Sequence, residues 1–397
     1  MRIGQLEYEF KHTEVEEGRM LSTRNRYMED RLNLSLPNEL ASATPTPYDH
    51  FIGGWRLLKR AGAGSHGDVV AASDKSNRLV AIKIMKRRSS NEIDRISQHI
   101  TAYQDLTRCL DGRHGVEYIQ ILSDVVYEKP TSGPRDQVFL FLTPLVETDF
   151  YKLFCQWKAN PTSTPAQKSR ECMFAQLLLA LSALHSVGFV HDDIKPHNIG
   201  LYKSHPPHVV VLDLDSAMDF RHCIDSTACI TTKHQDGGTI GYLAPEREGP
   251  RGTCYGTPVD IWAAGCFGLE LFFPGQRLQE QVGFNPYRDR TTFCAQNPPD
   301  VEEVQREKRN YDNWIQYLSS YCDQTPQHLL KQMLNLYPNH RMTAAKALRH
   351  PAIAHLLPSR TNTTTYSTSS AGSKRRLSAS RAAETSASSN LHCRRTR

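Results

Sequence analysis

Apolar and polar residues alternate in two stretches near the start of the patterned part of the chain, at residues 51–59 and 68–85. Alternation with a period of two predicts β-strands that are buried on one face. A glycine-rich turn separates the two stretches, and the continuous apolar run 138–142 predicts a further, buried strand. The first part of the chain is therefore predicted to be rich in β-structure.

Helical periodicity follows. Between residues 90 and 110 large apolar side chains recur every three or four positions, which predicts an amphipathic helix. A second, strongly apolar helix is predicted from Pro165, a favourable residue for a first turn, to Ser186. After about residue 255 the pattern is mainly helical. The predicted fold class is α+β, with a small β-rich part before a larger α-rich part.

The two ends of the chain have a different composition. Residues 1–47 are polar and show no sustained apolar period, and residues 359–397 contain 17 Ser and Thr residues. Such segments bury too little apolar surface to offset the entropy lost on ordering. We therefore expect a disordered N-terminal extension, an ordered domain at 48–356 and a disordered, basic C-terminal tail.

Charge and composition exclude several classes of protein. Residues 359–397 carry eight Lys or Arg residues and one acid, so the formal charge of +6 leaves residues 1–358 at −1. A near-neutral core argues against direct nucleic-acid binding. No apolar run approaches the roughly 20 residues of a membrane helix, and no secretory segment begins the chain. The ten cysteines form no CxxC pair, which argues against a zinc site and favours a reducing, intracellular compartment.

The glycine-rich turn reads Gly62-Ala63-Gly64-Ser65-His66-Gly67-Asp68-Val69. Glycines allow backbone N–H groups to approach phosphates closely, but a dinucleotide-binding fold would continue with a helix, and here a strand follows. That strand ends in Val80-Ala81-Ile82-Lys83. A buried lysine is costly unless it is paired, and a phosphate and a carboxylate would pair it.

With this pair of motifs the chain resembles the eukaryotic protein kinase family. His191-Asp192-Asp193-Ile194-Lys195-Pro196-His197-Asn198 is similar to the catalytic loop of that family. The resemblance implies that Asp193 accepts the proton of the substrate hydroxyl, that Lys195 neutralises the transferred phosphate and that Asn198 holds a magnesium ion. A lysine two residues after the aspartate is typical of Ser/Thr kinases.

The apolar run 209–212 leads into Asp213-Leu214-Asp215, which resembles the kinase DFG segment. The resemblance implies that Asp213 binds the metal, because it directly follows the predicted strand. Asp215 stands where the family has glycine. Two hypotheses remain open for it: a solvated residue, which we favour, or an additional metal ligand.

Three further motifs resemble structural parts of the family. Residues 238–246, ending in Ala244-Pro245-Glu246, resemble the end of the activation segment, and Asp260 lies in a DxWxxG-like helix. The resemblance implies that Asp260 caps the catalytic loop and that Arg341 pairs with Glu246. It covers roughly residues 50–355 and implies a bilobal kinase fold, with an N-lobe at about 48–143 and a C-lobe at about 147–356.

The resemblance also indicates how nucleotide is bound. Thr143 is the gatekeeper, and the expected ATP-binding residues are Ala61, Gly62, Ala63, Gly64, Gly67, Val69, Ala81, Lys83, Pro144 and Val146. The carboxylate partner of Lys83 is open between two acids of the predicted helix. Glu92 is followed by an apolar residue, as in the family, but lies only nine residues after Lys83; Asp105 fits better when counted back from the next strand. We favour Glu92.

One departure concerns regulation. Asp192 occupies the position at which many kinases carry the arginine that reads a phosphate on the activation segment. An acid would repel that phosphate. Thr227, Thr231 and Thr232 lie in this segment, and we predict that their phosphorylation is not required for activity.

Three functions compete. The first is an ATP- and Mg²⁺-dependent Ser/Thr protein kinase with protein substrates; the others are an ATP-binding pseudokinase scaffold and a small-molecule phosphotransferase. Because Lys83, Asp193 and Asp213 are all present, we favour the active protein kinase. We expect it in the cytoplasm, the nucleus or both. In the tail, residues 374–378 resemble a site for basophilic kinases, and their basic residues fit either a nuclear address or a solubilising run of charge.

Overall fold

The computed structural model describes most of the patterned part of the chain. The residues described are 2–3, 6–7, 51–64, 67–87, 90–128, 136–221, 230–231, 238–248, 254–278, 280 and 301–357. The two ends that the sequence predicts to be disordered lie outside this part of the chain, apart from β1 (Arg2–Ile3) and β2 (Leu6–Glu7), which pair with each other.

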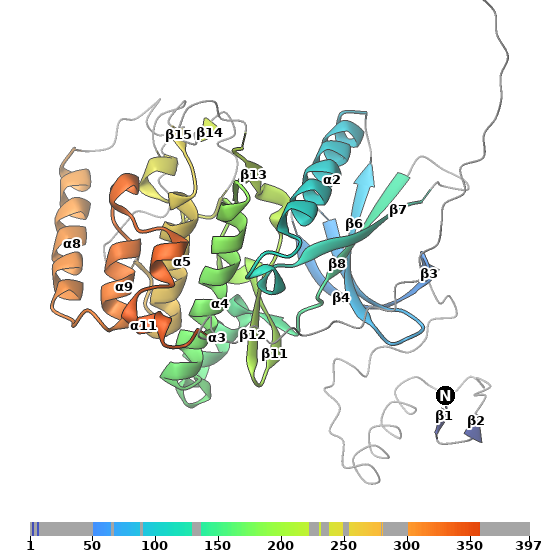
Figure 1. Ribbon diagram of the computed structural model, residues 1–397, viewed down its shortest axis with the longest axis horizontal. Coiled ribbons are helices and arrows are strands. Elements are labelled where there is room, and N and C mark those ends of the chain that lie inside the picture. The colour runs from blue at the N-terminus through green and yellow to red at the C-terminus, as the bar shows by residue number, and fades with distance from the viewer. Residues whose placement is uncertain are drawn as a thin grey trace, which may run out of the picture. The chain divides into compact units, whose positions relative to one another are not determined.

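The β-rich part forms an antiparallel sheet in the order β3-β4-β5-β6-β8-β7 (Figure 1). Its strands are β3 (Phe51–Ile52), β4 (Trp55–Gly64), β5 (Gly67–Ser73), β6 (Leu79–Arg87), β7 (Ile121–Glu128) and β8 (Asp136–Thr143). The alternation at 51–59 and 68–85 and the apolar run at 138–142 therefore predicted strands correctly. Most strands that follow one another in the chain are joined as hairpins and so lie next to each other in the sheet.

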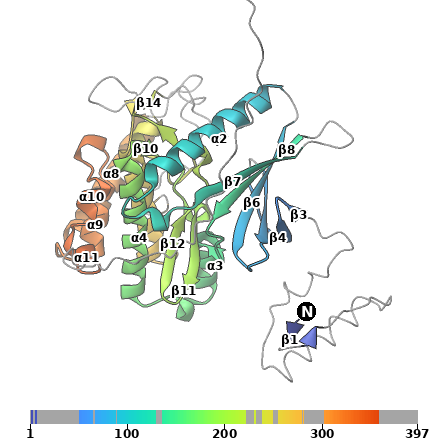
Figure 2. The ribbon, with the colours of Figure 1, turned by 45° about the vertical axis from the view of Figure 1, so that its right-hand side comes forward.

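Helix α2 (Ser90–Leu110) packs on one face of this sheet (Figure 2). Its buried side chains include Ile96, Ile100 and Leu106, at the helical spacing that the sequence shows. Successive residues of β8 point to opposite faces, so Leu140 joins the core beneath α2 while Phe141 joins a separate cluster on the other face. Lys83 lies opposite Leu140 in the register of β6 and β8.

The α-rich part is built around α5, which is almost entirely buried, and α4, which is largely buried after its first turn. Its helices are α3 (Phe150–Ala159), α4 (Gln167–Ser186), α5 (Pro258–Phe272), α8 (Val301–Ser319), α9 (Pro326–Met333), α10 (Ala344–Ala347) and α11 (Pro351–Ala354). At Gly268 of α5 an added Cβ would lie 2.7 Å from a methyl group of Leu330 and 2.8 Å from the ring of Phe174. The absence of a side chain at this glycine lets α5 pack closely on α4 and α9.

Short strands and single helical turns carry the loops that face the sheet domain. The strands are β9 (Thr148–Asp149), β10 (Phe189–Val190), β11 (Ile199–Ser204), β12 (Pro207–Val211), β13 (Met218–Asp219), β14 (Ile230–Thr231) and β15 (Cys254–Tyr255). The 3₁₀ turns are η2 (Val116–Tyr118), η3 (Pro161–Ser163), η4 (Pro196–Asn198), η5 (Leu214–Ser216), η6 (Pro245–Glu248) and η7 (Pro338–His340). A β-rich part followed by a helical part confirms the predicted α+β class. Among the described helices none combines the length and apolarity that crossing a membrane requires.

Candidate active site

The loop 191–198, which includes η4, connects β10 with β11, and Asp260 holds its backbone in place. Asp260 lies in the first turn of α5 and is 1% exposed. Its carboxylate accepts the backbone N–H of His191 at 2.8 Å and that of Asp192 at 2.9 Å, and it contacts His185 Nε2 at 2.9 Å. Burial raises the pKa of Asp260, but the hydrogen bond and charge of His185 lower it more, so the pKa lies below its usual value.

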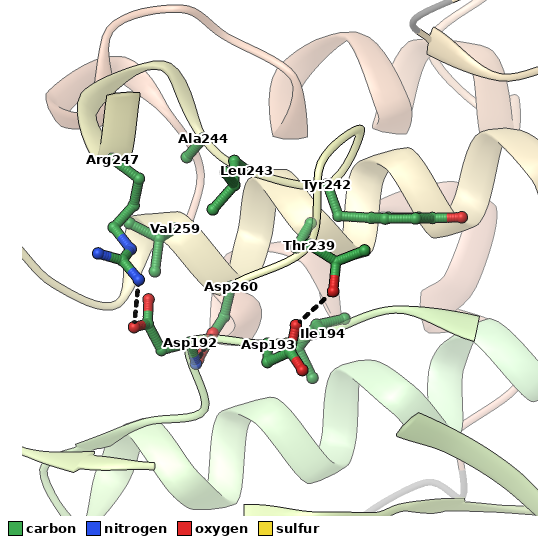
Figure 3. Close-up of a pocket in the computed structure, with 11 residues that line it drawn as sticks. Asp192, Asp193, Ile194, Thr239, Tyr242, Leu243, Ala244, Arg247, Val259 and Asp260 are labelled. Atoms are coloured by element: carbon green, nitrogen blue, oxygen red, sulfur yellow. Dashed lines mark hydrogen bonds and ion pairs between the residues drawn. The ribbon is translucent and has the colours of Figure 1, made fainter. Parts of the chain in front are cut away.

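Asp193 is surrounded by polar groups from the loop and from the segment after η5. Asn198 Nδ2 donates to Asp193 Oδ2 at 2.9 Å, and Lys195 Nζ lies 2.7 Å from the same oxygen. The hydroxyl of Thr239 donates to Asp193 Oδ1 at 2.8 Å and accepts from Lys195 Nζ at 2.9 Å (Figure 3). The carboxylate of Asp193 is thereby fixed in one orientation beside a pocket that Thr239 also lines.

Asp213 lies between β12 and η5 and contacts the β-rich part through Lys83. Its backbone is left-handed, with φ of 58°, a conformation that Asp tolerates better than most residues. Its Oδ1 lies 3.0 Å from Nζ of Lys83, which is 6% exposed at the centre of β6. The preceding residue, Leu212, donates its N–H to the carbonyl of Asn198 at 2.8 Å, so the two expected metal ligands lie on neighbouring backbone segments.

The glycine-rich turn is the hairpin between β4 and β5. Gly67 has φ of 149°, and a Cβ there would lie 2.3 Å from the carbonyl oxygen of Ile84. Only glycine fits this close approach of β5 to β6. Val69 lies opposite Lys83 in the register of these strands, and Ala81 is buried. Ser65 and His66 lie outside the described residues, as do the side chains of residues 62–64.

The connection after β8 contains the expected hinge. The carbonyl of Pro144, which we expected to meet adenine, accepts a hydrogen bond from Gln120 Nε2 at 2.8 Å. A carbonyl has two lone pairs, so Gln120 leaves one acceptor site on Pro144. A Cβ at Gly200 would lie 2.7 Å from Val146. The side chain of Val146 therefore fills the space above this glycine.

The structure gives Asp215 a position that neither sequence hypothesis foresaw. Its side chain is 6% exposed, and one carboxylate oxygen is bonded to Lys83 Nζ while the other lies 3.2 Å from His99 Nε2. A solvated Asp215 is therefore wrong. Asp105 lies against Arg221 at 2.5 Å, so the sequence alternative for the partner of Lys83 faces a different cation.

Glu92, the favoured partner of Lys83, lies in the first turn of α2, and its side chain is outside the described residues. Seven residues of helix separate Glu92 from His99, which corresponds to about 10.5 Å along the axis. Among the described residues of α2, His99 is the one that reaches the Lys83–Asp215 pair.

The carboxylate of Asp192 is buried and is not a solvent-exposed charge facing the activation segment. Its Oδ2 lies 2.7 Å from Nη2 of Arg247 and accepts the hydroxyl of Tyr255 at 3.2 Å (Figure 3). The guanidinium of Arg247 lies 4.5 Å from the centre of the Tyr255 ring. The side chains of Thr227, Thr231 and Thr232 lie outside the described residues.

The structure brings together the two residues expected to form a structural pair. Arg341 Nη1 and Nη2 lie 2.6 Å and 3.0 Å from the two carboxylate oxygens of Glu246, and the Arg341 side chain is fully buried. Arg341 also donates to the carbonyls of Asn335 and Pro258. This bidentate pair joins η6 to the helical core.

Sequence reasoning missed four residues of this site. Thr239 lies in a motif that the sequence identified only as architectural. Arg247 directly follows that motif, and no sequence pattern pointed to Gln120. His99 lies on the same helical face as the buried residues Ile96 and Tyr103, so the periodicity of α2 marked it as a polar residue on an apolar face.

The comparison with protein-family models matches the protein kinase domain to residues 55–353. The chain belongs to the protein kinase family. This kinase is 29% identical over 314 residues to the mitogen-activated protein kinase HOG1 of Cochliobolus heterostrophus, a match that covers 75% of this chain and 78% of the relative. It is 30% identical over 320 residues to the HOG1 kinase of Alternaria brassicicola, with the same coverage. It is also 31% identical over 188 residues to the calcium/calmodulin-dependent protein kinase type I of Schizosaccharomyces pombe, which covers 46% of this chain and 48% of the relative.

These matches decide among the three functional alternatives. The chain is a serine/threonine protein kinase, an ATP-dependent transferase of phosphate to protein hydroxyl groups. The family uses ATP together with a divalent metal ion, and its substrates are proteins.

Proposed function

We propose that this kinase binds MgATP between the glycine-rich hairpin and the β12–η5 connection, and that the residues identified by their motifs act there. The observation that carries the proposal is the convergence of three segments of the chain: β6, the loop 191–198 and the connection after β12. Lys83 of β6 reaches Asp213 at 3.0 Å, and Asn198 reaches Asp193 at 2.9 Å. Charged and amide groups from such distant segments converge in this way at catalytic sites.

The residues suit a magnesium ion. Mg²⁺ prefers oxygen ligands, and the Asp213 side chain is 38% exposed, so its carboxylate is accessible to a metal. Because Asn198 donates its Nδ2 group to Asp193, its amide oxygen is left as a ligand. A bound magnesium ion would neutralise charge on the phosphates.

The chain's own groups divide the remaining tasks. Lys83 binds ATP phosphates, and Lys195 neutralises the phosphoryl group in transfer. Asp193 orients the substrate hydroxyl and takes its proton while the new oxygen–phosphorus bond forms and the bond to ADP breaks. The hydrogen bonds from Thr239 and Asn198 hold the Asp193 carboxylate ready for this role, which is catalysis by positioning.

The test compares full-length wild type with Asp193→Asn and Asp213→Ala in a phosphate-transfer assay on a degenerate peptide array. Asp193→Asn keeps the shape of the side chain and removes the base, so we expect kcat to fall by about 10²–10⁴-fold. Asp213→Ala should abolish transfer, with melting temperatures unchanged. Asp94→Asn, an exposed acid of α2, is the control. Full activity of a folded Asp193→Asn variant would contradict the proposal.

We further propose an intracellular location and protein substrates carrying Ser or Thr. The basic tail supports the location, because Lys374, Arg375 and Arg376 match a nuclear address. The near-neutral charge of residues 1–358 supports protein rather than nucleic-acid partners. Fluorescence microscopy of the full chain and of a tail-deleted chain tests the role of these basic residues.

A further inference from the structure

One buried carboxylate joins three parts of the molecule next to the ATP site. Asp215 belongs to η5, two residues after Asp213, and its side chain is 6% exposed. Its Oδ2 is bonded to Nζ of Lys83 in β6, and its Oδ1 lies 3.2 Å from Nε2 of His99 in α2. Oδ2 of this carboxylate is therefore hydrogen-bonded to Lys83, and Oδ1 lies within ion-pair distance of His99.

Such an arrangement needs a physical reason, because burying charge is costly unless the charge is paired. The Lys83 side chain is 7% exposed, and its carboxylate contacts among the described residues are Asp213 and Asp215. Asp213 is the more exposed of the two acids, at 38%, and is the proposed metal ligand. Asp215 is buried with the lysine, so it is the acid suited to be a permanent partner of Lys83.

The electrostatics agree with this geometry. Burial lowers the pKa of Lys83, but the charges of Asp215 and Asp213 raise it above its usual value. Burial raises the pKa of Asp215, while His99 and Lys83 bring it well below its usual value. Among the described side chains of α2, Tyr103 also lies near these acids, and its hydroxyl donates to the Gln120 carbonyl at 3.0 Å.

We propose that Asp215 is the positioning residue of Lys83, and that His99 in turn positions Asp215. The carboxylate that aims Lys83 at the ATP phosphates then comes from the segment after the metal-binding strand. Helix α2 takes part through His99, so a shift of α2 would disturb the lysine through Asp215. The inference rests on the phosphate-binding role proposed for Lys83.

The two earlier hypotheses for Asp215 account for less of this geometry. A solvated acid would not be 6% exposed and bonded to a buried lysine. A metal ligand needs a free oxygen directed at the metal, whereas Oδ2 of Asp215 is bonded to Lys83 and Oδ1 lies 3.2 Å from the imidazole nitrogen Nε2 of His99. Positioning of Lys83 uses both contacts.

The experiment measures MgATP affinity, kcat and KM of full-length protein for wild type, Asp215→Asn, Lys83→Met and the double variant. Loss of a positioning partner commonly costs about 10–100-fold, and we expect this loss in kcat/KM for ATP with Asp215→Asn. The KM for peptide should stay unchanged, and kcat/KM is expressed per mole of folded protein because the substitution also removes a buried counter-charge of Lys83. In the Lys83→Met background Asp215→Asn should cause no further loss of MgATP affinity. Asp94→Asn is the matched control, an exposed acid of α2.

A second pair of variants tests His99 and does not depend on Asp215→Asn being stable. His99→Leu removes the donor and should lower kcat/KM for ATP by roughly 3–10-fold, a smaller loss than that of Asp215→Asn because Lys83 still holds the carboxylate. His99→Gln keeps an N–H donor and should restore most of this loss. Equal activity of the Leu and Gln variants would overturn the role of His99.

The outcomes separate this inference from the proposed function. If Lys83→Met binds and turns over ATP like wild type, the phosphate-binding role of Lys83 is wrong and the inference falls with it. If Lys83→Met is impaired and Asp215→Asn is not, only the inference is overturned. If the two losses multiply and Asp215→Asn needs more Mg²⁺ for half-maximal activity, Asp215 is a metal ligand and the inference is again overturned.

Discussion

Replacing Asp192 by Asn tests how the catalytic loop tolerates a buried acid. The Asp192 side chain is 5% exposed, and only its Oδ2 meets donors, from Arg247 and Tyr255, while its Oδ1 has no hydrogen-bond partner among the described residues. Burial raises the pKa of Asp192 to about 7, because it outweighs the opposing charge of Arg247. Asn has the same shape and also tolerates the φ of 65° found at this position, so the substitution removes the titration with little strain.

The sign and size of the effect follow from the raised pKa. The carboxyl of Asp192 has a pKa of 3.8 in the unfolded chain and about 7 in the folded one, so between these values the folded state holds a proton that the unfolded state has lost. Stability is therefore highest at the acid end of this window and is lost as pH rises towards 7. Integrated from about pH 5.5 to about pH 8, the loss for wild type relative to Asp192→Asn is about 2 kcal/mol.

Thermal or urea unfolding of the full chain at several pH values measures this difference. The contributions of all other titrating groups to the pH dependence of stability cancel in this difference, because both proteins share those groups. The melting temperature of wild type should fall relative to Asp192→Asn by about 3 °C across the window, because about 2 kcal/mol is divided by the large unfolding entropy of a domain of this size. Asp94→Asn is the control, since that carboxylate is exposed to water in the folded and unfolded chain alike. If wild type instead gains stability over Asp192→Asn as pH rises, the contact with Arg247 is a net favourable ion pair and the reasoning is refuted.

Two further predictions concern the structural pair and the activation segment. Glu246→Gln should destabilise the protein by about 3–5 kcal/mol, because it leaves the guanidinium of Arg341 buried without its counter-charge; chemical unfolding measures this, and a loss below about 1 kcal/mol would contradict it. Phosphatase-treated enzyme, and the triple Ala variant of Thr227, Thr231 and Thr232, should keep most of their peptide-kinase activity. A loss of more than roughly tenfold per mole of folded protein, about 1.4 kcal/mol of barrier, would show that a phosphate is needed.

The spacing of apolar residues predicted the helices and strands well, because each helix or strand buries side chains at a fixed spacing. The apolar spacing at 90–110 predicted α2 (Ser90–Leu110), since a helix buries one stripe of side chains whatever it packs against. Lys83, Asp193 and Asp213 were predicted by motif and spacing, and the structure brings Lys83 and Asp213 into contact.

Pairings between distant residues could not be predicted in the same way. Lys83 and Asp215 are 132 residues apart, and Asp192 and Arg247 are 55 apart. Which acid meets which base depends on how β6, η5 and η6 are packed, and no periodicity records that packing. Sequence reasoning therefore treated each unusual acid as an isolated departure, and gave it the role of a free charge.

The two unusual acids have a common explanation in the structure. Asp215 and Asp192 both stand where the resemblance to kinases leads one to expect a different residue. Each of them is buried against a base from a neighbouring element. Asp215 supplies Lys83 with a carboxylate, and Arg247 supplies the catalytic loop with a guanidinium opposite Asp192. A buried charge must be balanced locally. At both places the charged side chain is therefore balanced by an opposite charge from another element. The segment between Asp213 and Arg247 is thus joined at one end to β6 and at the other to the catalytic loop by unmodified side chains. That arrangement gives a physical reason to expect activity without phosphate on this segment.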